Sequence, residues 1–302
     1  MKQYIDGLNT ILDRGVLTKN RTGIDTISKF GLDIEYNLYR YEIPLLTTKK
    51  VHTASIIHEL IWMLSGNTNI KYLNDNKVTI WDEWADADGN LNKVYGHQWR
   101  NWNDTRFVER GSTEQQFCKT ADGFKRVMFD DIHEVYQRKI DQIVAIENQL
   151  KNNADSRRII LTAWNTAEIN EMALPPCHTL SQFSTREQDG EKILDCKLYQ
   201  RSADYFLGVP FNIAFYAIFT HMLAHVHGYT AGKLYHSIGD AHIYTNHQDQ
   251  VNTQLMRTID QDQSSPIVLI DGKFDSILDI KFENIIINNY NPQPTIKAPV
   301  AV

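Results

Sequence analysis

Residues 211–228 read FNIAFYAIFTHMLAHVHG and are apolar on almost every side of a helix. A helix that is apolar all round belongs inside a protein, and this segment is too short and too rich in histidine to favour a membrane span. Gly228 is a suitable residue to end it. We therefore expect one long buried helix at the centre of the fold.

Strand patterns lie on both sides of this helix. QFSTRE (182–187) and KILDCKLYQ (192–200) flank the turn dipeptide Asp189–Gly190, which favours a hairpin. Further strand candidates are SRRIILTAW (156–164), SPIVLI (265–270) and DIKFENIIINNY (279–290). Because helices and strands alternate irregularly, we expect the α+β class, with a large mixed β-sheet covered by helices.

Other helices are expected before and between these strands. An amphipathic helix is expected to end at Gly15, and a second, largely buried helix to start at Ser55 and to place Glu59 among apolar residues. A third helix is expected within 140–153. Residues from about 101 to 130 show no sustained period, which indicates an irregular insertion.

The composition limits the classes of function. The 302 residues carry a formal net charge of -6 and a sequence pI near 6.0. Binding to nucleic acid or to an anionic membrane needs a dense basic surface, so neither is favoured. No linker or internal repeat divides the chain, which favours one domain over residues 1–302. With no apolar run like that of a signal peptide, a soluble, cytoplasmic protein is expected.

The three cysteines, Cys118, Cys177 and Cys196, form no pattern of a disulfide framework or a zinc site, which fits a reducing cytoplasm. A free cysteine is usually a small buried hydrophobe, and that interpretation is kept for Cys118 and Cys196. Cys177 differs because LPPCH (174–178) places two prolines before it, which fix the backbone. It can serve as a nucleophile if a cationic neighbour lowers its pKa, since the thiolate attacks carbon.

Four arginines occupy positions suited to a phosphate site: Arg21, Arg157, Arg158 and Arg201. A guanidinium group matches a phosphate dianion with two parallel hydrogen bonds, and Ser202 can add a hydroxyl donor. For any single arginine, a solvated surface position or an ion pair is the commoner role. Sequence spacing alone does not show that the four converge.

Two clusters of polar side chains, each with histidine, are candidates for ligand binding. His242 and Tyr244 lie two residues apart, so in a strand both face one side and can present polar tips to a sugar hydroxyl; satisfied core polar groups are an equally common alternative. His221, His225 and His227 lack carboxylate partners at helical spacing, so no metal is assigned. The absence of a glycine-rich phosphate loop leaves ATP and nicotinamide chemistry without a motif.

Blocks along nearly the whole chain resemble the thymidylate synthase family, whose superfamily also contains dCMP hydroxymethylases. They include NRTG, PLLTTKKVH, HELIWMLSG, VTIWDEWAD, VYGHQW, DSRRI, ALPPCH, YQRSAD, FLGVPFNIA, GDAHIYTNHQDQ and IKAPVAV. The resemblance implies a methyltransferase that converts dUMP to dTMP, through covalent attack of Cys177 on C6 of the uracil. The implied co-substrate is 5,10-methylenetetrahydrofolate, which donates the carbon and the hydride and leaves as dihydrofolate. A homodimer with sheets packed across the interface is also implied.

The resemblance assigns roles to the residues that match these blocks. The implied catalytic residues are Cys177, Glu59, Tyr95, Asn212, Arg201 and His178. The implied dUMP ligands are Arg21, Gln200, Arg201, Ser202, Asp204, Asn212, His242 and Tyr244, with Arg157 and Arg158 donated by the neighbouring subunit. The implied folate-binding residues are His52, Ile80, Trp81, Trp84, Asp204, Leu207, Gly208, Phe211 and Ala301.

Elementary chemistry agrees with several of these roles. The amide of Asn212 can donate to O4 of uracil while it accepts from N3–H. The apolar helix around Glu59 raises the pKa expected for its carboxyl group, toward values useful in proton transfer. Closure of the chain end, Ala301 and Val302, over the ligands would keep water from a reactive methylene intermediate.

Four positions depart from the family's usual pattern. Phe215 stands where serine is usual, Ser184 where tyrosine is common, His97 where lysine follows VYG, and Asn67 where aspartate is usual. Phe215 lies one helical turn from Asn212, so this departure bears on the polar support of the residue that contacts the base.

Other classes of function share some of these residues. A dUMP hydroxymethylase would let water capture the methylene, whereas Trp81 and the IKAPVAV tail favour hydride transfer because both exclude water. Asn212 argues against a dCMP substrate, since the branch that uses dCMP resembles one with aspartate there. A non-catalytic nucleotide- or RNA-binding relative is disfavoured because Cys177 and the four arginines are all present. A cysteine hydrolase is disfavoured because His178 adjoins the cysteine, and adjacent side chains of an extended chain diverge.

Overall fold

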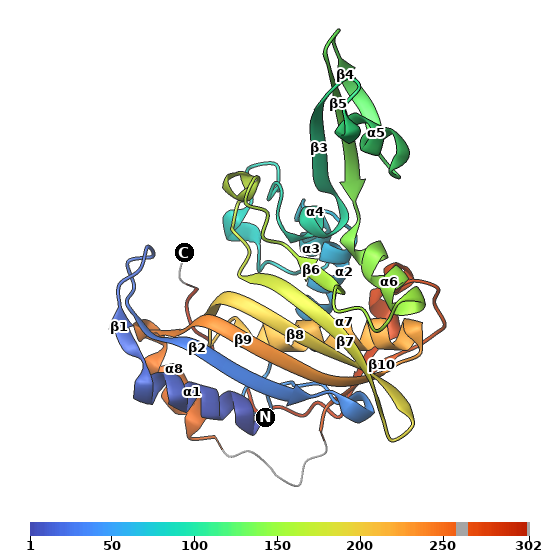
Figure 1. The fold of residues 1–302 in the computed structure, drawn as a ribbon. Helices are drawn as coiled ribbons and strands as arrows, with labels where there is room; N and C mark the ends of the chain where they lie inside the picture. The colour runs from blue at the N-terminus through green and yellow to red at the C-terminus, as the bar shows by residue number, and fades with distance from the viewer. Residues whose placement is uncertain (258–264, 301–302) are drawn as a thin grey trace.

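A six-stranded sheet forms the body of the protein in the computed structural model, which describes residues 1–257 and 265–300 (Figure 1). Its strands, in spatial order, are β1 (Val16–Thr18), β2 (Thr26–Asn37), β9 (Thr230–Tyr244), β8 (Glu191–Asp204), β7 (His178–Gln188) and β6 (Ile160–Thr162). Strands β8 and β9 run parallel, and every other neighbouring pair is antiparallel. The prediction of an α+β fold with a large mixed sheet is confirmed.

Helix α7 (Val209–His227) packs on one face of this sheet, against β8 and β9. It ends at Gly228, whose φ of 72° is left-handed, so the expected central helix and its stop are confirmed. Its length and composition would also suit a bilayer, but 78% of its most apolar stretch is buried inside the protein. It is therefore a core helix, and its amino-terminal end carries Asn212 toward the site described below.

The remaining elements enclose the core of the sheet and α7. They are α1 (Lys2–Arg14), α2 (Thr53–Leu64), α3 (Lys71–Asp75), α4 (Tyr95–Arg100), α6 (Gln142–Asn152), α8 (Gln248–Leu255), and the antiparallel pair β10 (Ile267–Ile270) and β11 (Ile285–Asn288), with short 3-10 turns between them. The hairpin between β7 and β8 turns at Asp189 and Gly190, which have φ values of 52° and 80°, as predicted.

The start of α2 differs from the prediction. The helix begins at Thr53 rather than after Ser55, and His52 is its N-cap. The Nδ1 atom of His52 accepts a hydrogen bond from the Ser55 backbone N–H, at 3.3 Å, which satisfies one amide of the first turn. An imidazole acceptor is not among the usual cap side chains, so the sequence pattern predicted Ser55 as the start of the helix instead.

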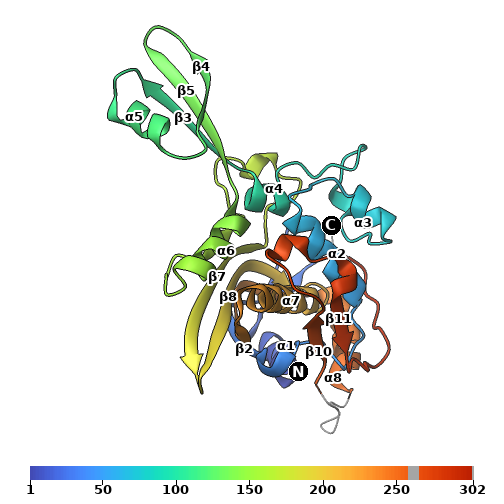
Figure 2. The ribbon, with the colours of Figure 1, turned by 90° about the vertical axis from the view of Figure 1, so that its right-hand side faces the viewer.

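The segment expected to be an irregular insertion is regular and longer than predicted. Strands β3 (Trp102–Glu109), β4 (Lys125–Phe129) and β5 (His133–Ile140) form a sheet in the order β3-β5-β4, with helix α5 (Thr113–Thr120) against β3. This arm projects from the body (Figures 1 and 2). It has its own small core of Val108, Cys118 and Tyr136, with Phe124 packed against it. Alternation of apolar and polar residues did not reveal β4 because both faces of this strand are exposed along its whole length.

The arm folds around a separate core, so its removal is expected to leave the body intact. In a variant with Asn-Gly in place of residues 105–137, the directly paired Asp104 and Arg138 are joined by a two-residue turn. We expect its melting temperature to stay within a few degrees of the parent value. As a control, Phe219→Ala in the main core is expected to cost about 3–5 kcal/mol. A melting temperature lowered as far by the deletion as by Phe219→Ala would show that the arm supports the body.

Candidate active site

A cavity of about 650 Å³ lies beside the amino-terminal end of α7 and brings together segments that are far apart in the sequence. The residues predicted for the site that line it are Arg21, Glu59, Ile80, Trp81, Trp84, Tyr95, Cys177, His178, Gln200, Arg201, Ser202, Asp204, Leu207, Gly208, Phe211, Asn212, His242 and Tyr244. Both polar and apolar side chains thus converge in one place, as a site for a polar aromatic ligand requires.

Other predicted site residues do not line this cavity within the single chain. Arg157 and Arg158 are exposed in the turn before β6, outside the lining. His52 is exposed at the start of α2 and caps that helix. Ala301 lies outside the described residues, as does Val302, although Ala298 and Val300 just before them line the cavity.

The loop of Cys177 is held by Arg201 of the neighbouring strand β8. The guanidinium group donates to the carbonyl oxygens of Pro176 (2.9 Å) and Pro175 (2.8 Å), and the Arg201 backbone N–H donates to the Cys177 oxygen at 2.8 Å. The Cys177 N–H in turn donates to the Tyr95 hydroxyl at 2.8 Å. Two prolines and four hydrogen bonds therefore fix the backbone of the loop that carries the thiol.

The electrostatics of Cys177 differ from the expectation. Burial raises the pKa of its thiol above the ordinary value, while the positive charges of Arg201 and Arg21 act in the opposite direction without outweighing it. A lowered pKa is thus not found in the single chain. Cys118 and Cys196 are both buried, as expected, and burial raises the pKa of Cys196 to about 12.

Glu59 provides a carboxyl group that can change protonation state near neutral pH. It lies on α2 in the cavity wall, and burial raises its pKa to about 7, partly offset by a hydrogen bond from the indole N–H of Trp81 at 2.8 Å. The prediction from its apolar helix is confirmed in direction. A carboxyl group with such a pKa can both accept and donate a proton under physiological conditions.

His178 is held neutral beside Cys177. Its ring stacks on Tyr95 with 4.2 Å between ring centroids, and its Nδ1 atom lies 3.0 Å from the Tyr216 hydroxyl. Burial lowers the pKa of His178 to about 3. Phe215 packs at 5.9 Å from the same imidazole, so the departure from serine adds an apolar neighbour to this ring.

Strand β9 and the start of α7 supply the other side of the cavity. His242 and Tyr244 both line it, as their two-residue spacing predicted, with their rings 5.2 Å apart. The Asp204 carboxylate accepts from the Phe206 and Leu207 N–H groups, both at 3.0 Å. These bonds hold the chain that leads from β8 into α7.

Several residues that line the cavity were not named individually in the prediction from sequence. They are Thr18, Lys19, Asn20, Thr22, Thr26, Leu174, Asp240, Ala298 and Val300. Asn20 accepts hydrogen bonds through Oδ1 from the Thr22 N–H (2.8 Å) and hydroxyl (2.6 Å), which shapes the loop of Arg21. The polar run around NRTG contains the signal for this turn, since asparagine commonly bonds to the backbone two residues on.

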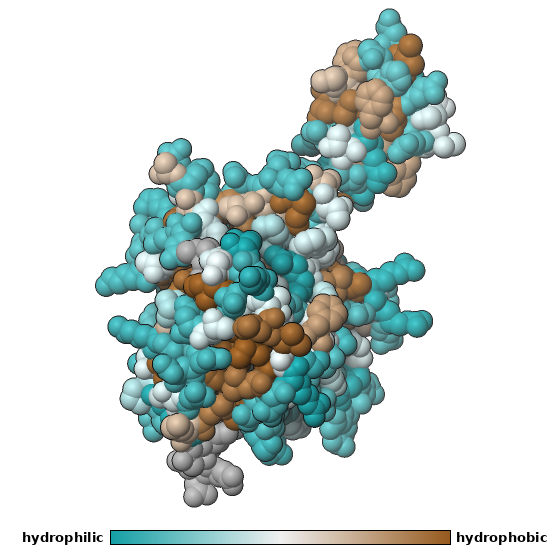
Figure 3. Space-filling model, turned by 90° about the vertical axis from the view of Figure 1, so that its left-hand side faces the viewer, coloured by the Kyte–Doolittle hydropathy of each residue, from teal (hydrophilic) through white to brown (hydrophobic). Residues whose placement is uncertain are grey.

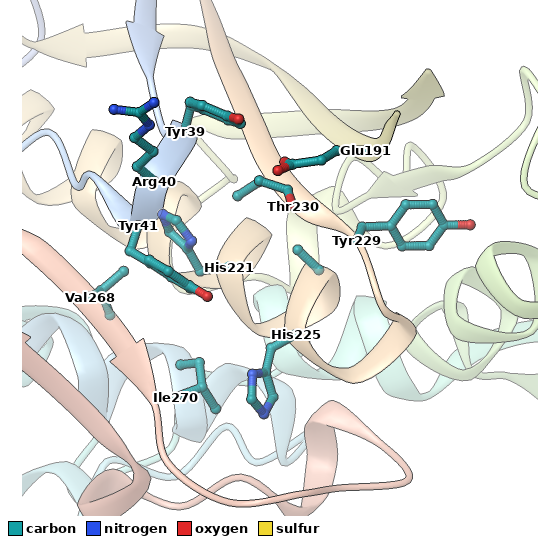
Figure 4. Close-up of a pocket in the computed structure, with 12 residues that line it drawn as sticks. Tyr39, Arg40, Tyr41, Glu191, His221, His225, Tyr229, Thr230, Val268 and Ile270 are labelled. Carbon is teal, nitrogen blue, oxygen red and sulfur yellow. The ribbon is translucent and has the colours of Figure 1, made fainter. Parts of the chain in front are cut away.

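A second cavity, of about 420 Å³, lies toward the carboxyl-terminal end of α7 (Figure 4). His221 and His225 line it from α7, and Tyr39, Arg40 and Tyr41 line it from the loop after β2. Among the described residues, none of those predicted for the site lies in its walls. His221 and His225 direct Nε2 to the backbone oxygens of Glu42 and Gly272 instead, at 2.9 and 2.8 Å.

The arrangement of histidine, cysteine and carboxylate side chains also bears on metal binding. Within 1–257 and 265–300, no group of three or more histidine, cysteine, aspartate or glutamate side chains is placed to hold a metal ion. His227 lies 3.5 Å from the Glu147 carboxylate, which also accepts from the Ser276 hydroxyl and the Ile277 N–H at 2.8 Å each. This cluster joins α6 and α7 to the segment after β10.

Comparisons with known proteins agree over the full length of the chain. A sequence model described as thymidylate synthase matches residues 2–302. Proteins named thymidylate synthase from three strains of Coxiella burnetii, Dugway 5J108-111, RSA 331 / Henzerling II and RSA 493 / Nine Mile phase I, are each 47% identical to it over 302 residues. The alignments cover 100% of both chains.

The buried carboxyl group of Glu59 is expected to make stability depend on pH. Its pKa is about 7 in the folded chain against an ordinary 4.5, so both states are protonated below pH 4.5. As the pH rises, the unfolded state loses its proton first, and the folded state loses stability up to about pH 7. Glu59→Gln removes this dependence and is expected to gain up to about 3 kcal/mol over the parent.

This difference is measured by urea unfolding of both proteins at pH 4.5 and 8, at one protein concentration. Glu283→Gln is a suitable control because this carboxyl group is exposed on the surface. A Glu59→Gln gain that is equal at the two pH values would contradict the assignment.

Proposed function

Because the chain belongs to the thymidylate synthase family, we propose that the cavity around Cys177 is where it methylates dUMP to dTMP with 5,10-methylenetetrahydrofolate. The observation that carries this proposal is the position of Cys177 in the wall of the cavity. Cys177 faces a cavity that also contains two guanidinium groups, a carboxyl group with a pKa of about 7 and the amide of Asn212. Each of these groups has a role when the thiolate adds to a uracil ring.

The first step joins the sulfur of Cys177 to C6 of the uracil. The thiolate electron pair forms the S–C6 bond, and the C5–C6 π electrons move toward C5 and the C4 carbonyl oxygen. Asn212, at the start of α7, donates to that oxygen as negative charge develops on it. C5 then attacks the methylene carbon of the folate. Arg21 and Arg201 favour the thiolate, although burial opposes it.

The phosphate of dUMP is bound by cationic side chains at the cavity rim. Arg21 and Arg201 line the cavity, and the Ser202 hydroxyl lies beside them. Because Arg201 already donates Nε and one terminal nitrogen to proline carbonyls, its remaining donors serve the phosphate. Arg157 and Arg158 are exposed and outside this cavity, so we assign them to the phosphate in a neighbouring subunit.

Removal of the C5 proton needs a general base. Glu59 can accept that proton, directly or through water, because its pKa lies close to neutral pH. The Tyr95 hydroxyl accepts from the Cys177 N–H, so its own proton points elsewhere and is available to water in the cavity. His178 remains neutral, and its position against Tyr95 keeps that ring in place.

The folate binds in the apolar part of the cavity. Trp81 and Trp84 pack edge to face at 5.9 Å, and Ile80, Leu207 and Phe211 extend the same surface. A planar pterin suits these walls, and Gly208 allows it a close approach. The Asp204 carboxylate retains acceptor capacity for a pterin N–H. His52, exposed at the start of α2, is assigned to the rim of this part of the site.

For the last steps we propose that the C–N bond to the folate breaks as C5 loses its proton, which leaves a methylene on C5. The reduced folate then transfers a hydride to this methylene, and the S–C6 bond breaks to release dTMP and return the Cys177 thiolate. The exocyclic methylene on C5 reacts with water if water reaches it. Trp81, whose N–H is already bonded to Glu59, leaves only its apolar ring toward the cavity. Ala298 and Val300 bring the carboxyl-terminal segment to the same wall. Both features favour dihydrofolate and dTMP over a hydroxymethyl product.

We also propose a cytoplasmic homodimer that uses the outer face of the sheet. On this face, which points away from α7, large apolar side chains are exposed, among them Leu180 and Tyr199, at 37% and 43% exposure. Leu180 and Tyr199 are a cross-strand pair, so they lie on one face. Apolar side chains also gather in a broad area of the body in Figure 3. A face of this kind commonly marks an interface.

The products identify the reaction. With dUMP and methylenetetrahydrofolate, we expect dTMP and dihydrofolate in equal amounts, measured by chromatography and by the absorbance of dihydrofolate. Cys177→Ser is expected to lose at least about 10³-fold in rate while it still binds dUMP, because serine is not ionised at this pH. Hydroxymethyl-dUMP with unoxidised folate would show the hydroxymethylase instead. No product from the parent protein would favour the non-catalytic relative.

The shared phosphate site is tested by mixing two inactive proteins. Cys177→Ser lacks the nucleophile, and the double variant Arg157→Ala/Arg158→Ala lacks the arginines donated to its partner. After subunit exchange, half of the dimers are mixed, and each has one complete site, so about a quarter of the parent activity should return. Mixing Cys177→Ser with Cys177→Ala is the matched control and should restore none. If mass spectrometry shows that subunits have exchanged and the first mixture is still inactive, the shared site is excluded.

A further inference from the structure

A chain of three polar side chains leads from the cavity into the core. Asn212 on α7 accepts through Oδ1 from the Gln200 amide nitrogen at 3.0 Å. The Gln200 amide oxygen lies 2.9 Å from Nε2 of His236 on β9. Asn212 and Gln200 line the cavity, whereas His236 is outside its lining and 1% exposed. His236 therefore acts on the site only through Gln200.

A backbone carbonyl identifies the orientation of the Gln200 amide. The Ser202 oxygen lies 3.2 Å from the Gln200 side-chain nitrogen, and a carbonyl oxygen can only accept. The NH₂ group of Gln200 must therefore face Ser202 and Asn212, and its oxygen must face His236. Because Asn212 meets an NH₂ group, it presents Oδ1 to Gln200 and its own NH₂ group to the cavity.

The same logic fixes the tautomer of His236. Its Nε2 atom faces an oxygen, so it carries the proton and donates. Its Nδ1 atom is buried without a hydrogen-bond partner among the described residues, as fits a bare ring nitrogen. Burial lowers the pKa of His236 to about 3, so the ring stays neutral under working conditions. The donor is thus constant, and the orientation of the relay does not vary with pH near neutrality.

We propose that His236 is a positioning residue for base specificity, which locks the Asn212 amide with its NH₂ group toward the pyrimidine. The inference rests on the proposed function, in which Asn212 contacts the base. An NH₂ group matches O4 of uracil and opposes the amino group of cytosine, which is also a donor. Without the His236 donor, the buried Gln200 oxygen is unsatisfied, and Gln200 and Asn212 can rotate to orientations that tolerate cytosine.

The test measures the dissociation constants of dUMP, dCMP and deoxyribose 5-phosphate, which lacks a base. In His236→Leu, which has no donor, we expect the preference for dUMP over dCMP to fall about tenfold. In His236→Gln, which places an amide donor near the position of Nε2, we expect most of the preference to return. Deoxyribose 5-phosphate should bind all variants alike. If His236→Leu does not fold, His236→Met supplies an apolar side chain that adapts more easily to the space.

Three results would overturn the proposal. They are an unchanged preference in His236→Leu, an equal loss for all three ligands, which would indicate a packing defect, and failure of His236→Gln to restore the preference in a folded protein. A parent protein that binds dUMP no better than dCMP would instead count against the proposed function. The two failures are thereby distinguishable.

Discussion

The bonds from Arg201 to the backbone of 175–177 are the constraint on which the site depends. They attach the loop of Cys177 to β8, the strand that also carries Gln200, Ser202 and Asp204. Because β8 lies against α7, the same attachment sets the distance between the thiol and the side chains at the start of that helix. The guanidinium group thus serves two purposes, since it orders the loop and places positive charge beside the sulfur.

Burial has opposite consequences for the groups in this cavity. It brings the pKa of Glu59 to about 7, where a carboxyl group is useful, and it keeps the imidazoles of His178 and His236 neutral. The same burial raises the pKa of the Cys177 thiol and so reduces the thiolate. A low-dielectric site therefore needs positive charge to recover part of the ionised thiol, and Arg21 and Arg201 supply it within the single chain.

Much of the fold was predictable because local signals agree with it. The apolar helix before Gly228 and the hairpin at Asp189–Gly190 were both expected from sequence. The arm was missed because its strands have little buried surface to give a period, and the cap at His52 because an imidazole rarely serves there. The convergence of the site residues came from resemblance, since spacing alone cannot show it. The raised thiol pKa depends on tertiary burial, and the relay to His236 on orientation between strands.

The order of strands in the sheet has a consequence for synthesis. Strand β2 pairs on one side only with the short β1 and on the other with β9, from Thr26 against Tyr244 to Asn37 against Lys233. About two hundred residues separate β2 from β9 in the chain. The two strands can therefore pair only in the last stages of translation. Until then an unpaired strand edge is open to other nascent chains, and rapid elongation or early chaperone binding favours the native fold.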